Sequence, residues 1–301
     1  MTESERIIKE GILPETFFEP ELRCEFYVDE TRKKIWAIEL DLYLELMRVC
    51  KKYDLTIWAD GGTLLGAVRH NGFIPWDDDM DLIMPRRDYD ILMDLGPKEF
   101  PTPYFLQNPY TDKQYGYSFA KLRNVNTTCM PRVLSKAGFC HGIHIDIFPL
   151  DIITIDTYER DRQEIKEHIM RCSSYMKRNN VNCLNKEQRD NYYRYKTDSP
   201  QKEYDAIHAI CKRHINEQSD YVANCTITTL NPKKQIWKKC WYRDSVLHQF
   251  ESIEIPIPID FESRLETQYG DYMKLPPINE RGLWHSGVIW DPDRMYEMYN
   301  I

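Results

Sequence analysis

The stretch ADGGTLLGAVRHNGFIPWDDDMDLIM, residues 59–84, indicates four elements in a row: a strand end, a glycine turn, a helix and an acidic strand. The run LTIWAD predicts a short strand that ends at Asp60. Gly61 and Gly62 interrupt the extended run, and the residues after them predict a helix, up to Arg69. Residues 79–84 then predict a second strand. A helix over residues 32–53, with a regular apolar stripe, precedes this unit.

Side chains alternate between the two faces of a strand. In the second strand Met80, Leu82 and Met84 therefore share one face, which we expect to point into the core. Asp79 and Asp81 share the opposite face, so two carboxylates are expected side by side at the start of the strand.

A third acid lies in the strand predicted over residues 141–148. There Ile143, Ile145 and Ile147 form the apolar face, and Asp146 lies on the other. If Asp79, Asp81 and Asp146 converge, two charges ~4 Å apart repel by about 4 kcal/mol at an effective dielectric near 20. A hard cation relieves this repulsion, and carboxylate oxygens with open positions suit Mg²⁺ or Mn²⁺. Such an ion can neutralise phosphate charge and activate a hydroxyl for in-line attack.

The glycine turn supplies a second feature of a phosphate site. Gly61 and Gly62 have no Cβ atoms, so their backbone can approach a phosphate closely. The N–H groups that open the next helix then point at the anion. Each feature alone has a simpler interpretation: a solvated acidic turn, an ordinary glycine turn, or a capping aspartate. Their combination favours a site that handles metal and phosphate.

The rest of the chain predicts an α+β fold with a mixed sheet up to about residue 150 and a largely helical second half. Charged helices are expected over residues 157–178 and 201–222, followed by the strand-like FESIEIPI. Asp260 is expected to cap a helix that runs to Gln268 and ends at Gly270. No Gly/Ser/Pro-rich linker separates the halves. We therefore expect a single domain, 1–301, in which 32–152 is the core and 153–301 a mainly helical extension completing the cleft.

Composition narrows the class of protein. The formal charge of -8, without a strong basic patch, argues against nucleic-acid binding. The nine cysteines lack a repeating spacing and predict free thiols in a reducing compartment. Cys211 and His214, with Cys172 and Cys183, could be arranged as a zinc site, but the spacing matches no strong zinc signature. No apolar run reaches membrane-spanning length, so we expect a cytoplasmic protein, with peripheral contact at the inner face of the membrane left open.

These residues resemble the LicD family, a branch of the nucleotidyltransferase superfamily that includes the fukutin-related proteins. The resemblance rests on GGTLLGAVRHNGFIPWDDDMDL (61–82), HIDIFPLD (144–151) and YGDYMKLPP (269–277). KLRNVNTT (121–128) gives weaker support. Residues 153–250 resemble nothing that we can name.

The resemblance implies a role for each matching residue. It implies that Gly61, Gly62 and Thr63 hold phosphate, and that Asp79 and Asp81 bind the metal. Asp146 is implied as the third carboxylate, near the acceptor hydroxyl, where it would accept the proton. Three cationic residues are expected to steer the donor diphosphate: Arg69, Lys121 and Arg123. Asp77 and Asp78 are expected to shape the acidic loop.

The implied reaction is transfer of a phosphocholine-type group from CDP-choline or a related CDP-alcohol to a sugar hydroxyl, with release of CMP. Members of the family decorate lipopolysaccharide, teichoic acids and other surface glycans, and some relatives transfer other phosphoalcohols such as ribitol phosphate. Two alternatives stay open: a nucleotidyltransferase that uses an NTP and releases pyrophosphate, and a non-catalytic sugar-binding member.

The C-terminal motif has two interpretations. Residues 269–277 carry two tyrosines, an acid and a lysine before a double proline, and His285 follows closely. One interpretation is that the segment folds back to line the cleft, where Tyr272 or His285 contacts the donor headgroup or the acceptor. The other is that it only closes the fold.

Overall fold

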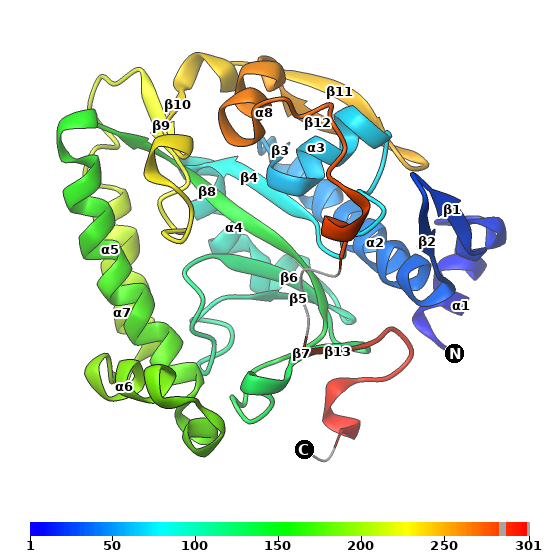
Figure 1. The fold of residues 1–301 in the computed structure, drawn as a ribbon, viewed down its shortest axis with the longest axis horizontal. Coiled ribbons are helices and arrows are strands. Elements are labelled where there is room, and N and C mark those ends of the chain that lie inside the picture. Colours follow the sequence, from blue (N-terminus) through cyan, green and yellow to red (C-terminus); the bar gives the residue numbers. More distant parts are fainter. Residues whose placement is uncertain (283–286, 300–301) are drawn as a thin grey trace.

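The computed structural model describes residues 1–282 and 287–299, and its architecture confirms the predicted α+β class (Figure 1). A seven-stranded mixed sheet lies at its centre. Its strands are β3 (Trp58–Ala59), β4 (Asp81–Pro85), β5 (Tyr104–Gln107), β6 (Ala120–Asn124), β8 (Ile143–Ile153), β9 (Tyr221–Ala223) and β10 (Trp237–Lys238).

The long strand β8 organises this sheet. It pairs in parallel with β4 along one side, and β3 continues the sheet beyond β4 as an antiparallel neighbour. Along its other side β8 pairs first with β6 and then, near its end, with β9. In Figure 1 it crosses the molecule diagonally, from the β7–β13 pair to β9. One strand thus connects two different regions of the protein.

Helices of the first hundred residues pack into the main hydrophobic core: α1 (Glu3–Lys9), α2 (Glu30–Tyr53), α3 (Gly61–His70) and α4 (Arg86–Glu99). Asp29 caps α2 by accepting a hydrogen bond from the backbone N–H of Arg32 at 2.8 Å. The predicted core face of β4 is confirmed, because Met80, Leu82 and Met84 are at most 1% exposed. The three isoleucines of β8 are likewise buried in this core.

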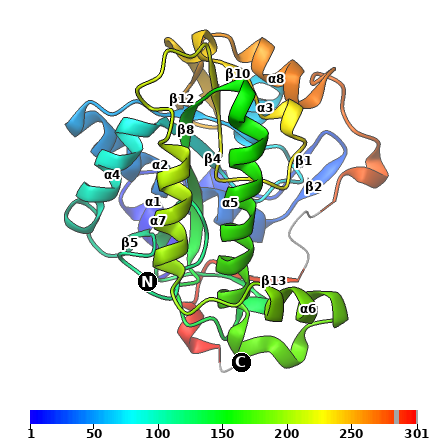
Figure 2. The same ribbon diagram turned by 90° about the vertical axis from the view of Figure 1, so that its left-hand side faces the viewer.

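The two helices expected in the second half correspond to α5 (Ile155–Met176) and α7 (Pro200–Cys211), and a third helix between them, α6 (Lys186–Arg194), was not predicted. Figures 1 and 2 show α5 and α7 side by side, and Ile165 and Ile207 bury their side chains in the core between them. The predicted helix over 201–222 was wrong in its end, because α7 stops at Cys211. Residues 212–220 contain a single apolar side chain, Ile215, so a longer helix would have no stripe to bury.

Short strands dominate from residue 221 on. The hairpin of β11 (Ser245–Phe250) and β12 (Ile253–Pro258) leads into α8 (Phe261–Tyr269). Asp260 and Gly270 cap α8 as predicted, and Gly270 has φ +71°. Two further pairs are β1 (Glu21–Arg23) with β2 (Phe26–Val28), and β7 (Thr128–Pro131) with β13 (Val288–Asp291). No helix among the described residues is both long and apolar enough to cross a membrane.

Candidate active site

Three charged side chains lie in one row across neighbouring strands of the sheet. The parallel register of β4 and β8 places Asp81 opposite Asp146, and the antiparallel register of β6 places Lys121 opposite Asp146. Lys121 Nζ donates to Asp146 Oδ1 at 2.5 Å, and His144 Nε2 lies 3.4 Å from the same oxygen. The convergence of Asp81 and Asp146 that the sequence predicted is therefore present.

Asp79 belongs to the loop that leads into this row. The ladder of β4 begins at Asp81 instead of the predicted Asp79, although Met80 still accepts a hydrogen bond from the backbone N–H of Asp146 at 2.8 Å. One carboxylate oxygen from each of Asp77, Asp78 and Asp79 lies within 4.8 Å of the others. This group adds to the negative charge beside Asp81.

The electrostatics of the site reflect this crowding. Burial raises the pKa of Asp81 well above its usual range, and Asp79, Asp146, Asp60 and Asp77 raise it further by repulsion. The pKa of Asp77 is also raised well above its usual value, first by burial and then by Asp79. Burial lowers the pKa of Lys121, opposed by its pairing with Asp146. The acids are held together against their repulsion, which is the arrangement that a cation stabilises.

The glycine turn lies directly against these acids. Gly61 has φ +53°, and a Cβ atom there would come within 2.8 Å of Asp81 Oδ2. A Cβ on Gly62 would come within 2.6 Å of Asp77 Oδ2. Thr63 accepts a hydrogen bond on Oγ1 from the backbone N–H of Asp81 at 2.7 Å. The turn therefore makes room for carboxylates and holds the acidic strand, in addition to the phosphate contact that the sequence suggested.

Sequence reasoning missed Glu39, a buried acid beneath the acidic loop. Glu39 is 0% exposed, and neither carboxylate oxygen has a hydrogen-bond partner among the described residues. On the same face of α2, Arg32 Nη1 and Trp36 Nε1 both donate to the backbone oxygen of Asp77. Burial raises the pKa of Glu39 well above its usual value, and Asp79, Asp78 and Asp77 add to this. A helical projection of residues 32–53 could have found it, because Glu39 follows Ile35 by one turn in the apolar stripe.

A buried ion pair supports the start of the glycine turn and was also missed. Asp60 precedes Gly61, and its Oδ1 accepts a hydrogen bond from Arg264 Nη2 at 2.5 Å. Arg264 comes from α8, lies 3.8 Å above the ring of Trp237 and donates through Nε to the hydroxyl of Tyr242 at 3.0 Å. The two partners are 204 positions apart in the sequence, so no local pattern could indicate the pair.

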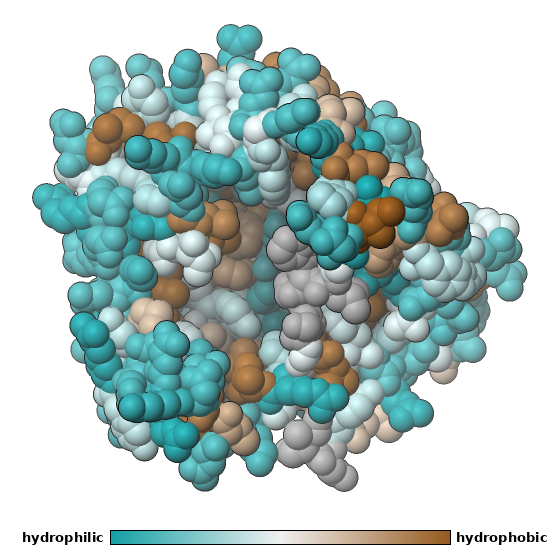
Figure 3. All heavy atoms as spheres, in the orientation of Figure 1, coloured by the Kyte–Doolittle hydropathy of each residue, from teal (hydrophilic) through white to brown (hydrophobic). Residues whose placement is uncertain are grey.

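Aromatic rings form much of the wall of a cavity of about 210 Å³ in front of Asp79 and Asp146. The face drawn in Figure 3 is hollowed near its centre, over the region where Figure 1 shows β6 and β8. The rings of this wall come from β13 and from two loops; they are Tyr117, Phe119, Phe139 and Trp290. The ammonium group of Lys121 lies 5.0 Å from the ring centre of Tyr117 and 5.2 Å from that of Phe119. The cavity combines acids with π faces that attract cations.

Arg123 lies in this cavity wall but is engaged by protein groups. Its Nε donates to the side chain of Gln107, and Nη1 donates to the backbone oxygen of Gly142 at 2.5 Å. Nη1 also lies 3.1 Å from His144 Nδ1. Arg123 thus orients His144, which in turn lies beside Asp146.

Arg69 lies away from the cavity. It holds the C-terminal segment, because Nη1 donates to the backbone oxygens of Tyr272 at 2.9 Å and Lys274 at 3.3 Å. Tyr272 packs against the main core and is absent from the walls of the cavity in the part of the chain that the structure describes. His285, the other residue predicted for the headgroup or acceptor, lies outside the described residues.

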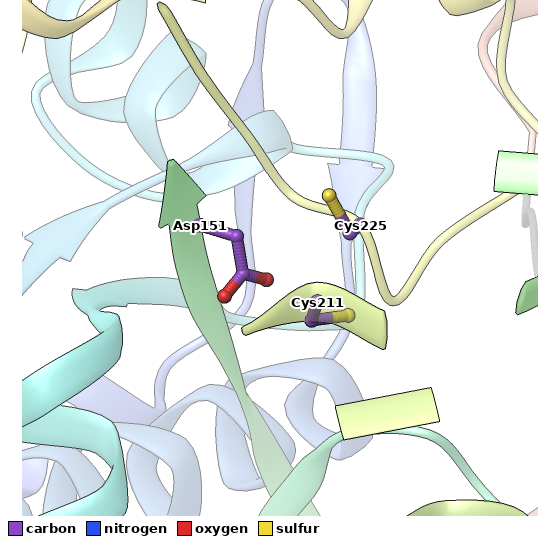
Figure 4. A group of neighbouring side chains, drawn as sticks. All are labelled: Asp151, Cys211 and Cys225. Carbon is purple, nitrogen blue, oxygen red and sulfur yellow. The ribbon is translucent and has the colours of Figure 1, made fainter. Parts of the chain in front are cut away.

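The cysteines that the sequence left open as a zinc site do not group with His214 among the described residues. Cys172 Sγ donates to the backbone oxygen of Pro200, and His214 Nε2 pairs with Asp161 at 2.9 Å. Instead Cys211 lies beside Cys225 and Asp151, with ligand atoms within 4.8 Å of one another (Figure 4). All nine cysteines are free thiols.

The residues at the start of β4 and β8 fit a hard divalent cation. Asp79, Asp81 and Asp146 supply carboxylate oxygens, which are the ligands that Mg²⁺ and Mn²⁺ prefer. The unpartnered carboxylate of Glu39 and the room left by the two glycines are further signs of a site with excess negative charge. Asp151 offers no such excess, because both of its oxygens accept hydrogen bonds from Arg86, at 2.6 and 3.0 Å.

The chain is similar in sequence to a known family and to individual known proteins. Residues 54–178 match the family model described as LicD/FKTN/FKRP, nucleotidyltransferase domain. The chain is 26% identical over 243 residues to the lipopolysaccharide cholinephosphotransferase LicD of Haemophilus influenzae. The aligned region covers 79% of this chain and 89% of that protein. The chain is 51% identical over 124 residues to an uncharacterized protein of Rickettsia typhi, which covers 39% of this chain and 34% of that protein.

Proposed function

We propose that the protein, of which residues 54–178 match the LicD family model of a nucleotidyltransferase domain, transfers a phosphocholine-type group from a CDP-activated donor to a sugar hydroxyl and releases CMP. The observation that carries the proposal is the row of Asp81, Asp146 and Lys121 in front of an aromatic cavity. The Haemophilus relative, named as a lipopolysaccharide cholinephosphotransferase, supports choline as the headgroup and a lipid-linked glycan as the acceptor.

Asp79, Asp81 and Asp146 would hold Mg²⁺ or Mn²⁺. The bound ion would neutralise charge on the donor phosphates and lower the pKa of the attacking hydroxyl. We assign proton acceptance to Asp146 Oδ2, which accepts no hydrogen bond from the described residues, while Oδ1 is held by Lys121. Lys121 thus fixes the orientation of the carboxylate that faces the acceptor.

The glycine turn orients the donor in this proposal. The N–H groups at the start of α3 would donate hydrogen bonds to a donor phosphate. The partial positive charge of the helix N-terminus would favour binding of this anion. Thr63 contributes through the backbone of Asp81, whose position it fixes. Phosphate binding by Gly61 and Gly62 remains a prediction that mutation can test.

The aromatic wall suits a quaternary ammonium headgroup. Phe139 and Trp290 add two rings to the cavity besides Tyr117 and Phe119, which already face Lys121. A trimethylammonium group gains from aromatic faces and needs no hydrogen bond. A ribitol or glycerol headgroup would need several hydrogen-bond partners. We therefore place choline ahead of the polyols as the headgroup.

Free thiols support a reducing compartment. We therefore propose that the reaction takes place at the cytoplasmic face of the membrane, where a lipid-linked acceptor would be presented.

Product analysis tests the reaction. The purified protein is incubated with Mg²⁺ and CDP-choline, CDP-ribitol, CDP-glycerol or an NTP, and nucleotides are separated by chromatography. We expect CMP from CDP-choline, accelerated by a glycan acceptor. Pyrophosphate from an NTP would indicate a nucleotidyltransferase instead. Absence of turnover combined with sugar binding would indicate a non-catalytic member.

A further inference from the structure

A second and larger cavity, of about 600 Å³, lies at the other end of β4 and β8. Its walls are mainly apolar and include Trp58, Leu150, Ile152, Val222 and Tyr242. Leu150 and Ile152 alternate along β8 in step with Asp146, so they lie on the same face of the sheet. Pro85 lies four positions after Asp81, which corresponds to ~13 Å of extended strand. The two cavities therefore follow one another along β8, whose course Figure 1 shows.

Cations surround this apolar space. Arg87, Lys239 and Arg243 line it and are exposed, and within the described ranges 1–282 and 287–299 none of them makes an ion pair. Arg86 also lines it but is neutralised by Asp151. Four cations face two carboxylates, those of Asp151 and Asp220, so the cavity is positive although the whole chain carries -8.

The chemistry of the wall favours an amphiphile over a nucleoside. None of its described residues carries a side-chain amide or an aliphatic hydroxyl, two of the groups that bind base edges and ribose. The hydroxyl of Tyr242 is already engaged by Arg264. Apolar walls with unpaired cations instead match a molecule with a hydrocarbon tail and an anionic head.

We propose that this cavity binds a lipid phosphate, with the hydrocarbon chain against the apolar wall and the phosphate beside Arg87, Lys239 and Arg243. Its identification as the lipid end of the glycan acceptor rests on the proposed function. The binding itself does not. The arrangement places the lipid end of the acceptor at one end of β8 and the reacting hydroxyl beside Asp146, near the other.

Calorimetric titration of the intact protein with octyl phosphate, inorganic phosphate and octanol tests the proposal. We expect octyl phosphate to bind at least tenfold more tightly than either of the other two, because each of them supplies only half of the contacts. The Lys239→Gln and Arg243→Gln double variant should lose at least tenfold in affinity for octyl phosphate. Ile215→Asp places a charge on a half-exposed residue of the apolar wall and should have a similar effect without loss of folding.

Lys233→Gln is the matched control, because Lys233 is an exposed lysine of the same segment that does not line the cavity. Equal affinity for inorganic and octyl phosphate would overturn the proposal in favour of a simple anion site. If CMP binds more tightly than octyl phosphate, and the same substitutions weaken its binding, the proposal would be overturned in favour of a nucleotide site. Unchanged affinity in both variants would place the amphiphile elsewhere. Because no assay measures turnover, lipid binding can hold or fail independently of the transfer reaction.

Discussion

Two aspartates of β8, Asp146 and Asp151, are each paired with a buried cation, yet their surroundings differ. Both oxygens of Asp151 accept hydrogen bonds from Arg86, so its charge is balanced by a buried arginine, which also lies 3.4 Å from Asp90. Asp146 has Lys121 on a single oxygen, and it lies in one row with Asp81, beside Asp79 of the adjoining loop.

This difference distinguishes a structural ion pair from a candidate reaction centre. A balanced buried pair leaves no charge available for a ligand, and removal of one partner destabilises the protein because the other charge remains buried. In a group of acids with too few cations the carboxylates repel one another, and a bound divalent ion would reduce this repulsion. An excess of one charge, more than burial or pairing, is therefore the feature on which we base the proposed metal site at that end of the sheet.

The largest expected effect is on turnover at the unbalanced end. Asp81→Asn, Asp79→Asn and Asp146→Asn should each lower kcat by at least about a thousandfold, ~4 kcal/mol, while the fold is retained. Steady-state CMP release and circular dichroism measure the two quantities. EDTA should abolish activity of the unmodified protein, and full activity in EDTA would refute the metal-dependent reaction.

At the balanced end the effect should be on stability. Arg86→Met leaves Asp151 buried without its partner, and we expect the free energy of unfolding to fall by about 3–5 kcal/mol. Urea denaturation measures this loss. The double variant Arg86→Met, Asp151→Leu should recover much of it, because both charges are removed. A loss of less than 1 kcal/mol in the single variant would contradict a structural role for this pair.

Gly62→Ala tests the contact between the glycine turn and the acids. Its Cβ would lie 2.6 Å from Asp77 Oδ2, so that carboxylate must move. Donor affinity in the presence of Mg²⁺ should fall about tenfold, ~1.4 kcal/mol, by calorimetry. Gly282→Ala is the control, because a Cβ there meets open space. Unchanged donor affinity in folded Gly62→Ala protein would remove the turn from the site.

The smallest effect concerns pH. Because the pKa of Asp81 is raised on folding, the folded protein binds the proton more tightly than the unfolded chain. Without metal, stability relative to Asp81→Asn should therefore fall as pH rises above the ordinary aspartate pKa of about 3.9. Thermal unfolding from pH 4 to 8 measures this, at about 2–4 °C per kcal/mol. Mg²⁺ should restore the stability of the unmodified protein at neutral pH. A stability difference between the two proteins that stays constant from pH 4 to 8 would contradict the coupling between protonation of Asp81 and folding.

The sequence allowed prediction of those features of the site that depend on local spacing. Strand alternation placed Met80, Leu82 and Met84 in the core, and it placed Asp81 and Asp146 on the face that the structure brings together. The helix α2 and the caps of α8 followed equally from apolar periodicity and capping residues.

The features that escaped prediction depend on contacts between distant segments. Trp290 reaches the cavity only because β13 pairs with β7, and Arg264 reaches Asp60 across most of the chain. The predicted helix over 201–222 also ran into β9, because a prediction based on charged, helix-forming residues does not consider the pairing of β9 with β8. Nothing in local composition separates Asp151 from Asp146. Their difference appears only when their partners are known.

Binding of Mn²⁺, followed by electron paramagnetic resonance of the free ion, tests the central comparison most directly. We predict that the unmodified protein and Asp151→Asn, where it remains folded by circular dichroism, bind Mn²⁺ equally well. Asp81→Asn and Asp146→Asn should bind it at least tenfold more weakly, and Asp220→Asn, at the other cavity, should not differ from the unmodified protein. Equal binding by Asp81→Asn, or loss of binding in folded Asp151→Asn, would contradict the assignment of the metal site to the unbalanced end of the sheet.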